Sequence, residues 1–259
     1  MLKIKTLTQR YFIELAYKGT NFHGWQIQPN AQTVQECLEK ALSVIIREPI
    51  SVTGAGRTDT GVHASYFVAH FDSEKNELDH PDFTYKLNSF LGKDIGIIAV
   101  SKVSSDAHAR FDALSRTYQY HLNLKKDPFV LETSWQFHGR PDLHVMNEAS
   151  RILFDYNDFT SFSKLHTDVK TNNCKIYLAE WTHNGSKIVF TVKADRFLRN
   201  MVRALVGTLL EVGLGKVDLS GFRHIIEQKD REAAGLSVPA HGLFLTNIEY
   251  PEQLFKRNI

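Results

Sequence analysis

The chain has 259 residues, of which 42% are hydrophobic and 23% charged, a balance that is typical of a folded protein with a core and excludes a largely disordered one. Its 31 basic and 29 acidic residues leave a net charge of only +2, so the composition does not indicate a strongly basic nucleic-acid binder. Any surface for nucleic acid must therefore come from local clustering of charge.

The apolar stretches of the chain are short. The longest, such as residues 95–100, fall far short of the roughly 18 residues that a membrane-spanning helix needs. The N-terminal sequence MLKIKTLTQRYF lacks the apolar block of a signal peptide. Cys37 and Cys174 lie far apart without CxxC spacing, which indicates neither a zinc site nor a disulfide framework. These features predict a cytoplasmic protein without a membrane partner.

The first part of the chain alternates between strand and helix patterns. Thr33 and Glu36 form a T-x-x-E capping box, and apolar residues at helical spacing follow it as far as Ile46, which predicts a helix. Period-two alternation and short apolar runs predict strands around this helix. The elements expected here are strands at residues 10–16, 50–55, 66–71 and 95–103, and helices at residues 34–46 and 83–90.

The second part repeats this theme. Asn184 and Gly185 stand between two alternating runs, which predicts a β-hairpin. The other elements expected are strands at residues 117–124 and 243–250 and helices at residues 143–154 and 197–212. The sequence therefore predicts an α+β fold of two ferredoxin-like or RRM-like halves, residues 1–105 and 106–259, whose mainly antiparallel sheets flank a central cleft or merge.

Residues 54–64 read GAGRTDTGVHA and place one carboxylate, Asp59, on a glycine-rich turn. Gly54, Gly56 and Gly61 can take backbone conformations that are closed to other residues, and Arg57 can hold a nearby carboxylate ionised. Asp59 is therefore the first candidate for chemistry. The alternative is an aspartate that only shapes its own turn, which is the more common role in such a composition.

Two further patterns point to a binding surface. Arg199 and Arg203 lie four residues apart on the helix expected at residues 197–212, where they could meet an anion or form a solvated polar face. Tyr118 and Tyr120 point to the same side of a predicted strand, where they could pack at the edge of the core or stack on unpaired bases.

Several common catalytic patterns are absent from the sequence. The chain has no GxSxG, Walker GxxxxGK[ST], HExxH, or H-x-E with a following CxxC. Asp59 and His63 are four residues apart, but the glycines around them disfavour a helix and no further metal ligand is evident. We expect no metal.

The ordered motifs resemble the TruA-type family of tRNA pseudouridine synthases over residues 10–251. The most specific match is GRTDTGVHA at residues 56–64, in which Thr60 stands where the family more often has alanine. The supporting matches are YKG at residues 17–19, GWQ at 24–26, VQ at 34–35, HARF at 108–111, RTYQY at 116–120, DFTSF at 158–162, MVR at 201–203 and GL at 242–243.

The resemblance implies a role for individual residues. Asp59 would be the catalytic nucleophile, Arg203 would pair with it across the cleft, and Tyr118 would pack on the target base. Arg57 would hold the flipped nucleotide or its phosphate, and Leu243 would also contact the substrate. Independently of the resemblance, Arg110, Lys164, Lys170 and Lys175 are basic residues that could contact phosphate.

The resemblance also implies the substrate and the assembly. Members of the family act on uridines 38, 39 and 40 in the anticodon arm of tRNA, work as homodimers, and use no metal or organic cofactor. The main alternative is a non-catalytic RNA-binding protein of two ferredoxin-like halves, in which Tyr118 and Tyr120 stack on bases and Asp59 shapes a turn. A glycosidase is disfavoured because no second acid is evident.

Overall fold

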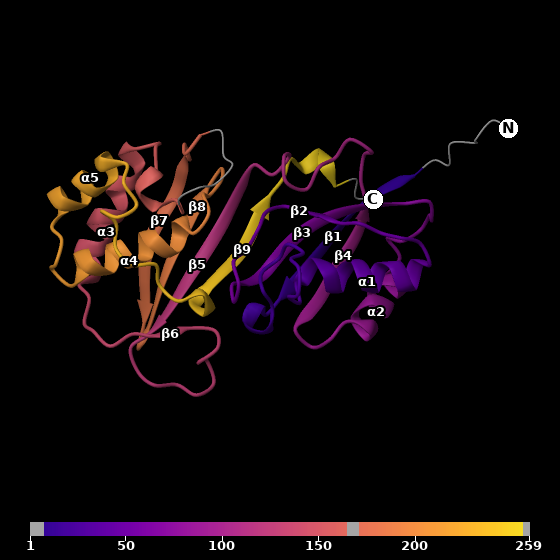
Figure 1. Cartoon of the computed structure of the whole chain (residues 1–259), viewed down its shortest axis with the longest axis horizontal. Helices are drawn as coiled ribbons and strands as arrows, with labels where there is room; N and C mark the ends of the chain where they lie inside the picture. The colour runs from indigo at the N-terminus through magenta and orange to yellow at the C-terminus, as the bar shows by residue number, and fades with distance from the viewer. Residues whose placement is uncertain (1–7, 165–170, 256–259) are drawn as a thin grey trace. The chain divides into compact units, whose positions relative to one another are not determined.

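The computed structural model describes residues 8–164 and 171–255. The chain forms two compact units (Figure 1). Unit 1 comprises Met1–Leu114 and Asn247–Ile259, and unit 2 comprises Ser115–Thr246. The α+β class with mainly antiparallel strands is confirmed within each unit. The domain boundaries expected from sequence, 1–105 and 106–259, stay a prediction.

Unit 1 contains a sheet in the order β4-β1-β3 with two helices. Strand β1 pairs antiparallel with both neighbours, and α2 packs on β4 beside α1. Its elements are β1 (Gln9–Tyr17), α1 (Val34–Ile46), β2 (Thr53–Gly54), β3 (His63–Ser73), α2 (Pro81–Phe90) and β4 (Ile95–Lys102). The core lies between this sheet and the apolar faces of the helices.

Helix α1 begins where the sequence predicts. The Thr33 hydroxyl accepts the backbone N–H of Glu36 at 3.3 Å, which satisfies one of the free donors at the start of the helix. The helix ends at Ile46, and the next residue, Arg47, takes a left-handed φ of 63°. The buried side chains Val34, Leu38, Ala41, Leu42 and Ile46 form the predicted apolar face. Local capping and periodicity are therefore sufficient to define this helix.

The strand predicted at residues 50–55 is much shorter in the structure. Only Thr53–Gly54 pairs with β3. The backbone N–H of Ile50 donates instead to Ser43 Oγ, and that of Val52 donates to Glu39 Oε1, each at 2.9 Å. Side chains of α1 thus take the hydrogen bonds that a strand partner would have made.

Unit 2 contains a sheet in the order β5-β8-β7, with β9 beside β5 and the short β6 parallel to β5. Helix α3 packs against β7 and α4, and α5 packs against α3 and α4. The elements are β5 (Ser115–Asn123), β6 (Trp135–Gln136), α3 (Leu143–Ile152), β7 (Ile176–Asn184), β8 (Lys187–Ala194), α4 (Met201–Gly213), α5 (Leu219–Gln228) and β9 (Leu243–Glu249), whose residues after Thr246 belong to unit 1. The predicted hairpin is confirmed, with Gly185 at a φ of 62°.

The helix expected at residues 197–212 begins later than predicted. Asn200 takes a left-handed φ of 67°, and α4 starts at Met201, so Arg199 lies in the preceding turn. Arg199 and Arg203 therefore do not share a helical face, and that part of the prediction was wrong. Helix α5 was not predicted, although Asp218 caps it by accepting the backbone N–H of Gly221 at 2.6 Å.

Within residues 8–164 and 171–255, no helix combines the length and the apolar character that crossing a membrane would require.

Candidate active-site elements

Asp59 lies in the loop between β2 and β3, on a turn that is held by hydrogen bonds. Its side chain is half-buried, its carbonyl oxygen accepts the N–H of Val62 at 3.1 Å, and Arg57 beside it is exposed. The hydroxyl of Thr58 is hydrogen-bonded to Tyr17 Oη at 2.9 Å in a buried contact. The loop is therefore anchored to β1 directly before the candidate nucleophile.

The segment of residues 19–25 braces this turn from the other side. A Cβ atom on Gly24 would lie 2.4 Å from the carbonyl oxygen of Thr58, and Gly24 also has a φ of 86°. A Cβ atom on Gly19 would lie 2.0 Å from the carbonyl oxygen of Val62. Both positions accept only glycine without movement of the backbone. The two glycines thus allow a close approach that fixes the turn at both ends.

The three glycines in and beside the turn, Gly54, Gly56 and Gly61, differ in whether the structure requires glycine there. Gly61 has a φ of 80°, as expected from sequence, and Gly54 packs against Trp25, whose Nε1 would lie 2.5 Å from an added Cβ. A Cβ on Gly56 would meet nothing within 4 Å. The predicted special backbone conformation is therefore confirmed at Gly61 and not found at Gly54 or Gly56, and Gly54 is constrained instead by its contact with Trp25.

The possible metal pair of Asp59 and His63 finds no support. The backbone N–H of Gly19 donates to Nδ1 of His63 at 2.9 Å, and the imidazole is buried. His63 thus joins β3 to the bracing segment. In the part of the chain that the structure describes, no group of three or more His, Cys, Asp or Glu side chains could hold a metal ion.

Arg203 stands in the first turn of α4 and is half-buried. Its Nε donates to the carbonyl oxygen of Val238 at 2.7 Å, and the N–H of Val238 donates back to the carbonyl oxygen of Arg203 at 3.2 Å. One turn later, a Cβ on Gly207 would lie 1.9 Å from the carbonyl oxygen of Leu236. Residues 231–239, which we call the strap, therefore lie directly on α4 and orient the Arg203 side chain.

Tyr118 and Tyr120 lie on β5 in different environments. The ring of Tyr118 is half-buried and meets Phe197 edge-on, with centroids 5.1 Å apart. The ring of Tyr120 is fully buried, its Oη donates to the carbonyl oxygen of Pro239 at 2.8 Å, and burial raises the pKa of its phenol. Of the two, only Tyr118 is accessible enough to stack on a base, and Tyr120 belongs to the core of unit 2.

The remaining candidates differ in exposure. Leu243 is buried at the start of β9, whereas Arg110, Lys164 and Lys175 are exposed. Lys170 lies outside the described residues.

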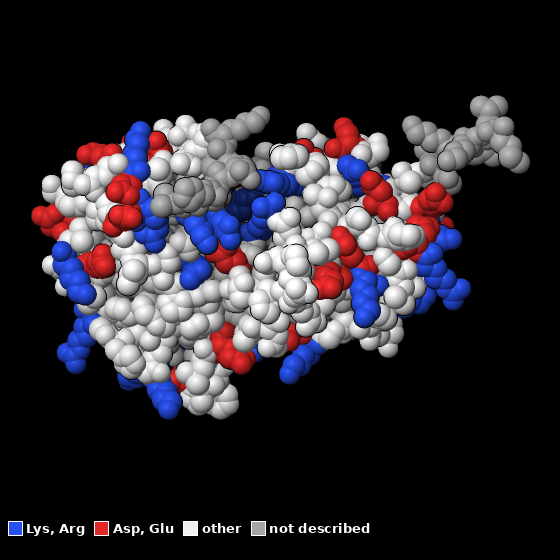
Figure 2. All heavy atoms as spheres, in the orientation of Figure 1, with Lys and Arg blue, Asp and Glu red and all other residues white. Residues whose placement is uncertain are grey.

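Basic side chains gather at one end of the unit 2 sheet, where β5 and β7 begin and β8 ends. Figure 2 shows blue side chains over this end of unit 2. The residues concerned are Arg116, Lys175, Lys193 and Arg196. Asp195 lies among them, and its carboxylate accepts the backbone N–H of Lys175 at 2.8 Å. The sheet end is thus positively charged overall and fits a phosphate backbone.

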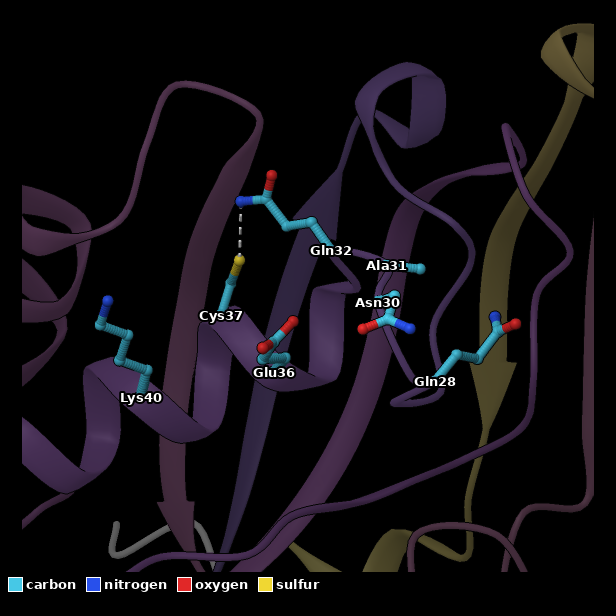
Figure 3. Close-up of a pocket in the computed structure, with 7 residues that line it drawn as sticks. All are labelled: Gln28, Asn30, Ala31, Gln32, Glu36, Cys37 and Lys40. Carbon is cyan, nitrogen blue, oxygen red and sulfur yellow. Dashed lines mark hydrogen bonds between the residues drawn. The ribbon is translucent and has the colours of Figure 1, made fainter.

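A separate pocket of about 450 Å³ opens beside the first half of α1 (Figure 3). Its lining is mostly polar and includes a hydrogen bond of 3.4 Å from Gln32 Nε2 to Cys37 Sγ. None of the candidate residues lines it. The pocket is therefore distinct from the aspartate turn.

Comparisons with known proteins identify the family. A family model described as tRNA pseudouridine synthase matches residues 15–112 and 153–251. The chain belongs to the tRNA pseudouridine synthase family. It is 58% identical over 247 residues to the tRNA pseudouridine synthase A of Parabacteroides distasonis, which covers 95% of this chain and 98% of that protein. It is 59% identical over 250 residues to the protein of that name from Bacteroides thetaiotaomicron (95% and 93% covered), and 38% identical over 240 residues to that from Bacillus subtilis (91% and 97% covered).

A tRNA pseudouridine synthase is an enzyme that isomerises uridine in tRNA, and the family predicted from the sequence motifs is confirmed. Asp59, Arg57 and Arg110 lie in the first matched segment, and Arg203 and Leu243 lie in the second. Tyr118 lies between the two segments.

Sequence reasoning gave no role to several residues that support the candidate groups. Gly19 and Gly24 belong to quoted motifs, yet their function as a brace appears only when the backbone of the aspartate turn is seen against them. The strap was missed because its contact with α4 depends on Gly207, which in sequence reads as an ordinary small helix residue. Close backbone approach is a tertiary property, and a lone glycine is its only local signal.

Proposed function

We propose that this tRNA pseudouridine synthase isomerises uridines 38, 39 and 40 in the anticodon arm of tRNA, with Asp59 as its nucleophile. The observation that carries this proposal is the placement of one carboxylate on a turn that two glycines and Thr58 hold rigidly. A nucleophile must be fixed relative to the atom that it attacks, since preorganisation of the reacting groups lowers the barrier. The brace provides this fixation for Asp59.

The reaction requires a group that can form a bond and later leave. The bond between C1′ and N1 breaks, a bond between C1′ and C5 forms, the proton on C5 is lost, and N1 ends protonated. A carboxylate suits both steps, because it can attack C1′ as in a retaining glycosidase or add to C6 of the uracil ring. Both routes begin from the ionised form of Asp59.

The partner residues follow from the same chemistry. We assign Arg203 to pair with Asp59, because an arginine about 4 Å from a carboxylate contributes roughly 4 kcal/mol at an effective dielectric near 20 and keeps the acid charged in a dry site. Tyr118 would receive the flipped base, since leaving the helical stack costs a few kcal/mol that a new ring contact offsets. Arg57 would hold the nucleotide or its phosphate.

Further binding residues complete the proposed site. Leu243 would contact the substrate from the start of β9, and Arg110 would bind it from the segment that follows β4. Lys164 and Lys175 would contact phosphates elsewhere on the tRNA. The proposed assembly is a cytoplasmic homodimer whose ferredoxin-like halves flank a central cleft, and no cofactor takes part.

The direct test is replacement of Asp59 by asparagine. Asp59→Asn keeps the size of the side chain and its place in the turn but removes the nucleophilic charge. We expect no detectable pseudouridine in an unmodified tRNA transcript, with tRNA affinity within about three-fold of the parent protein, because the group acts in bond formation and not in docking. Carbodiimide labelling followed by primer extension locates the product.

The matched control is Asp79→Asn, which removes an exposed aspartate of unit 1 away from the turn. This variant should retain full activity. Sustained turnover by Asp59→Asn would rule out the carboxylate as nucleophile. If the parent protein binds tRNA but forms no pseudouridine, the result would instead favour a non-catalytic RNA-binding module.

A further inference from the structure

A series of aromatic and imidazole rings runs from the core of unit 1 to its surface. Phe12 on β1 is fully buried, and its ring centroid lies 6.3 Å from that of His70 on β3. His70 lies 4.6 Å from His108, and His108 lies 4.2 Å from Phe111 with an interplanar angle of 34°. The side chain of Phe111 is 74% exposed. The series thus ends in a large apolar ring that presents itself to solvent.

The backbone that carries Phe111 is held by histidine acceptors. The N–H of Ala109 donates to Nδ1 of His70 at 3.2 Å, and the N–H groups of Arg110 and Phe111 donate to Nδ1 of His108 at 3.1 and 3.3 Å. Three consecutive amides are therefore bound to two unprotonated ring nitrogens. Such a run leaves little freedom to the segment, so the exposure of Phe111 is a fixed feature of the fold.

Contacts from both ends of the chain also fix this segment. Arg10 on β1 donates through Nη1 to the carbonyl oxygen of Ala107 at 3.0 Å, and Tyr250 Oη donates to the carbonyl oxygen of Ala109. The carboxylate of Asp112 accepts the N–H of His108 at 2.7 Å. An exposed phenylalanine held this firmly loses little conformational entropy when a ligand stacks on it.

The guanidinium group of Arg110 lies over the Phe111 ring. The guanidinium carbon of Arg110 lies 5.7 Å from the centroid of the Phe111 ring. An aromatic face beside a guanidinium matches the two parts of a nucleotide, because the base offers a π-face and the phosphate offers a negative charge.

We propose that Phe111 and Arg110 form a docking site for one unpaired nucleotide of the RNA substrate, with the base stacked on Phe111 and its phosphate bound by Arg110. This inference rests on the proposed function, which supplies the RNA. It adds a base-stacking residue on unit 1 that is separate from the proposed contact of Tyr118 with the target base. Because RNA loops expose unpaired bases and duplexes do not, the site reads the loop of the anticodon arm.

The experiment measures binding of an anticodon stem-loop RNA to the full chain. Phe111→Ala should weaken binding by about 5- to 150-fold, the range that corresponds to the loss of one stacked base worth about 1–3 kcal/mol. Phe111→Trp should bind at least as well as the parent protein, whereas Phe111→Leu should resemble Phe111→Ala, since leucine is apolar but has no π-face. The matched control is Tyr85→Ala, which removes another unit 1 ring that is 74% exposed and should leave binding unchanged.

A second RNA separates stacking from general affinity. A blunt duplex of the stem sequence has no unpaired base, so Phe111→Ala and the parent protein should bind it equally. An equal loss of affinity for the duplex and the stem-loop would overturn the proposal. So would an unchanged stem-loop affinity in Phe111→Ala, or a change in its oligomeric state at parent RNA affinity, which would assign the ring to a second copy of the chain.

Failure of the Phe111 docking site and failure of the proposed function would give different results. Phe111→Ala should raise the tRNA concentration that gives half-maximal pseudouridine formation, because the residue docks the RNA and does not touch the reacting atoms. Absence of product from the parent protein would refute the proposed function, whereas normal RNA binding by Phe111→Ala in an active enzyme would refute the docking site alone.

Discussion

His70 shows how one buried side chain can couple the stability of unit 1 to pH. The imidazole is 7% exposed and accepts the N–H of Ala109 through Nδ1. Burial lowers the pKa of His70 to about 4, and the positive charge of Arg10 acts in the same direction. The carboxylates of Asp72 and Asp112 oppose them and favour the protonated form. The neutral ring is therefore the form that the fold requires.

Stability should fall as the pH drops from about 6.5 towards about 4. An unfolded histidine has a pKa near 6.5, so within this window the unfolded state binds more protons than the folded state, and acid favours unfolding. The contribution of His70 is fully present above about pH 6.5, and its loss amounts to at most about 3 kcal/mol. The measurement is the free energy of urea unfolding at several pH values for the parent protein and for His70→Asn.

The asparagine variant keeps an acceptor near the position of Nδ1 but does not titrate. The difference in unfolding free energy between the two proteins should therefore shrink as the pH falls. His183→Asn, at an exposed position in unit 2, serves as the matched control. Parallel pH profiles for the parent protein and His70→Asn would contradict the role assigned to this histidine.

At the scale of elements, helix α4 and the strap depend on one glycine. Ordinary helix propensity predicts that Gly207→Ala stabilises α4 by about 1 kcal/mol. The added Cβ would lie 1.9 Å from the carbonyl oxygen of Leu236, so the strap would have to move away. We expect the steric cost to dominate and the free energy of unfolding to fall by about 1–3 kcal/mol.

Displacement of the strap should also affect catalysis. It would disturb the hydrogen bond from Arg203 Nε to Val238, so Gly207→Ala should lose activity together with stability. The control is Gly221→Ala in α5, where the new Cβ would meet only side-chain atoms of Asp218 and Val217 at 3.1 and 3.2 Å. Melting curves and product formation report the two effects. A Gly207→Ala protein that is more stable than the parent would show that the strap is not held in this way.

The elements that sequence could predict are those with local causes. Helix α1 has its cap and its apolar face within one window, and the hairpin has its turn pair. The errors occurred where a distant or conformational effect decided the outcome. Asn200 delayed the start of α4 through a left-handed φ, and α1 side chains took the strand hydrogen bonds of residues 50–52.

In the candidate site, too, features with a local cause could be predicted and features that depend on distant contacts could not. Asp59 and Arg57 could be proposed as candidates from the sequence because a glycine-rich turn gathers the two groups within a few residues. The brace by Gly19 and Gly24, the strap over Arg203 and the histidine acceptors below Phe111 were not predicted, because each joins segments that are distant in sequence. Motifs can point to candidate groups, whereas the contacts that hold those groups in place are seen only in the three-dimensional structure.

At the scale of the whole molecule, a net charge of +2 leaves tRNA binding to depend on a few clusters of basic residues. The end of the unit 2 sheet where β5 and β7 begin is one such cluster. Lys175 lies at this end, and Lys187 lies at the opposite end of the same hairpin. Both side chains are exposed, so the two lysines form a matched pair that differs in position and not in type.

Replacing each lysine by alanine locates the RNA on unit 2. Each phosphate contact that is lost should reduce the slope of log affinity against log salt concentration by about 0.7 to 0.9, because fewer counterions are released on binding. We expect this reduction for Lys175→Ala and an unchanged slope for Lys187→Ala. The Lys175 backbone N–H still donates to Asp195 Oδ1 after the substitution, so the strand end should remain folded. Equal slopes for the two variants, or a reduction in Lys187→Ala alone, would place the RNA away from this sheet end.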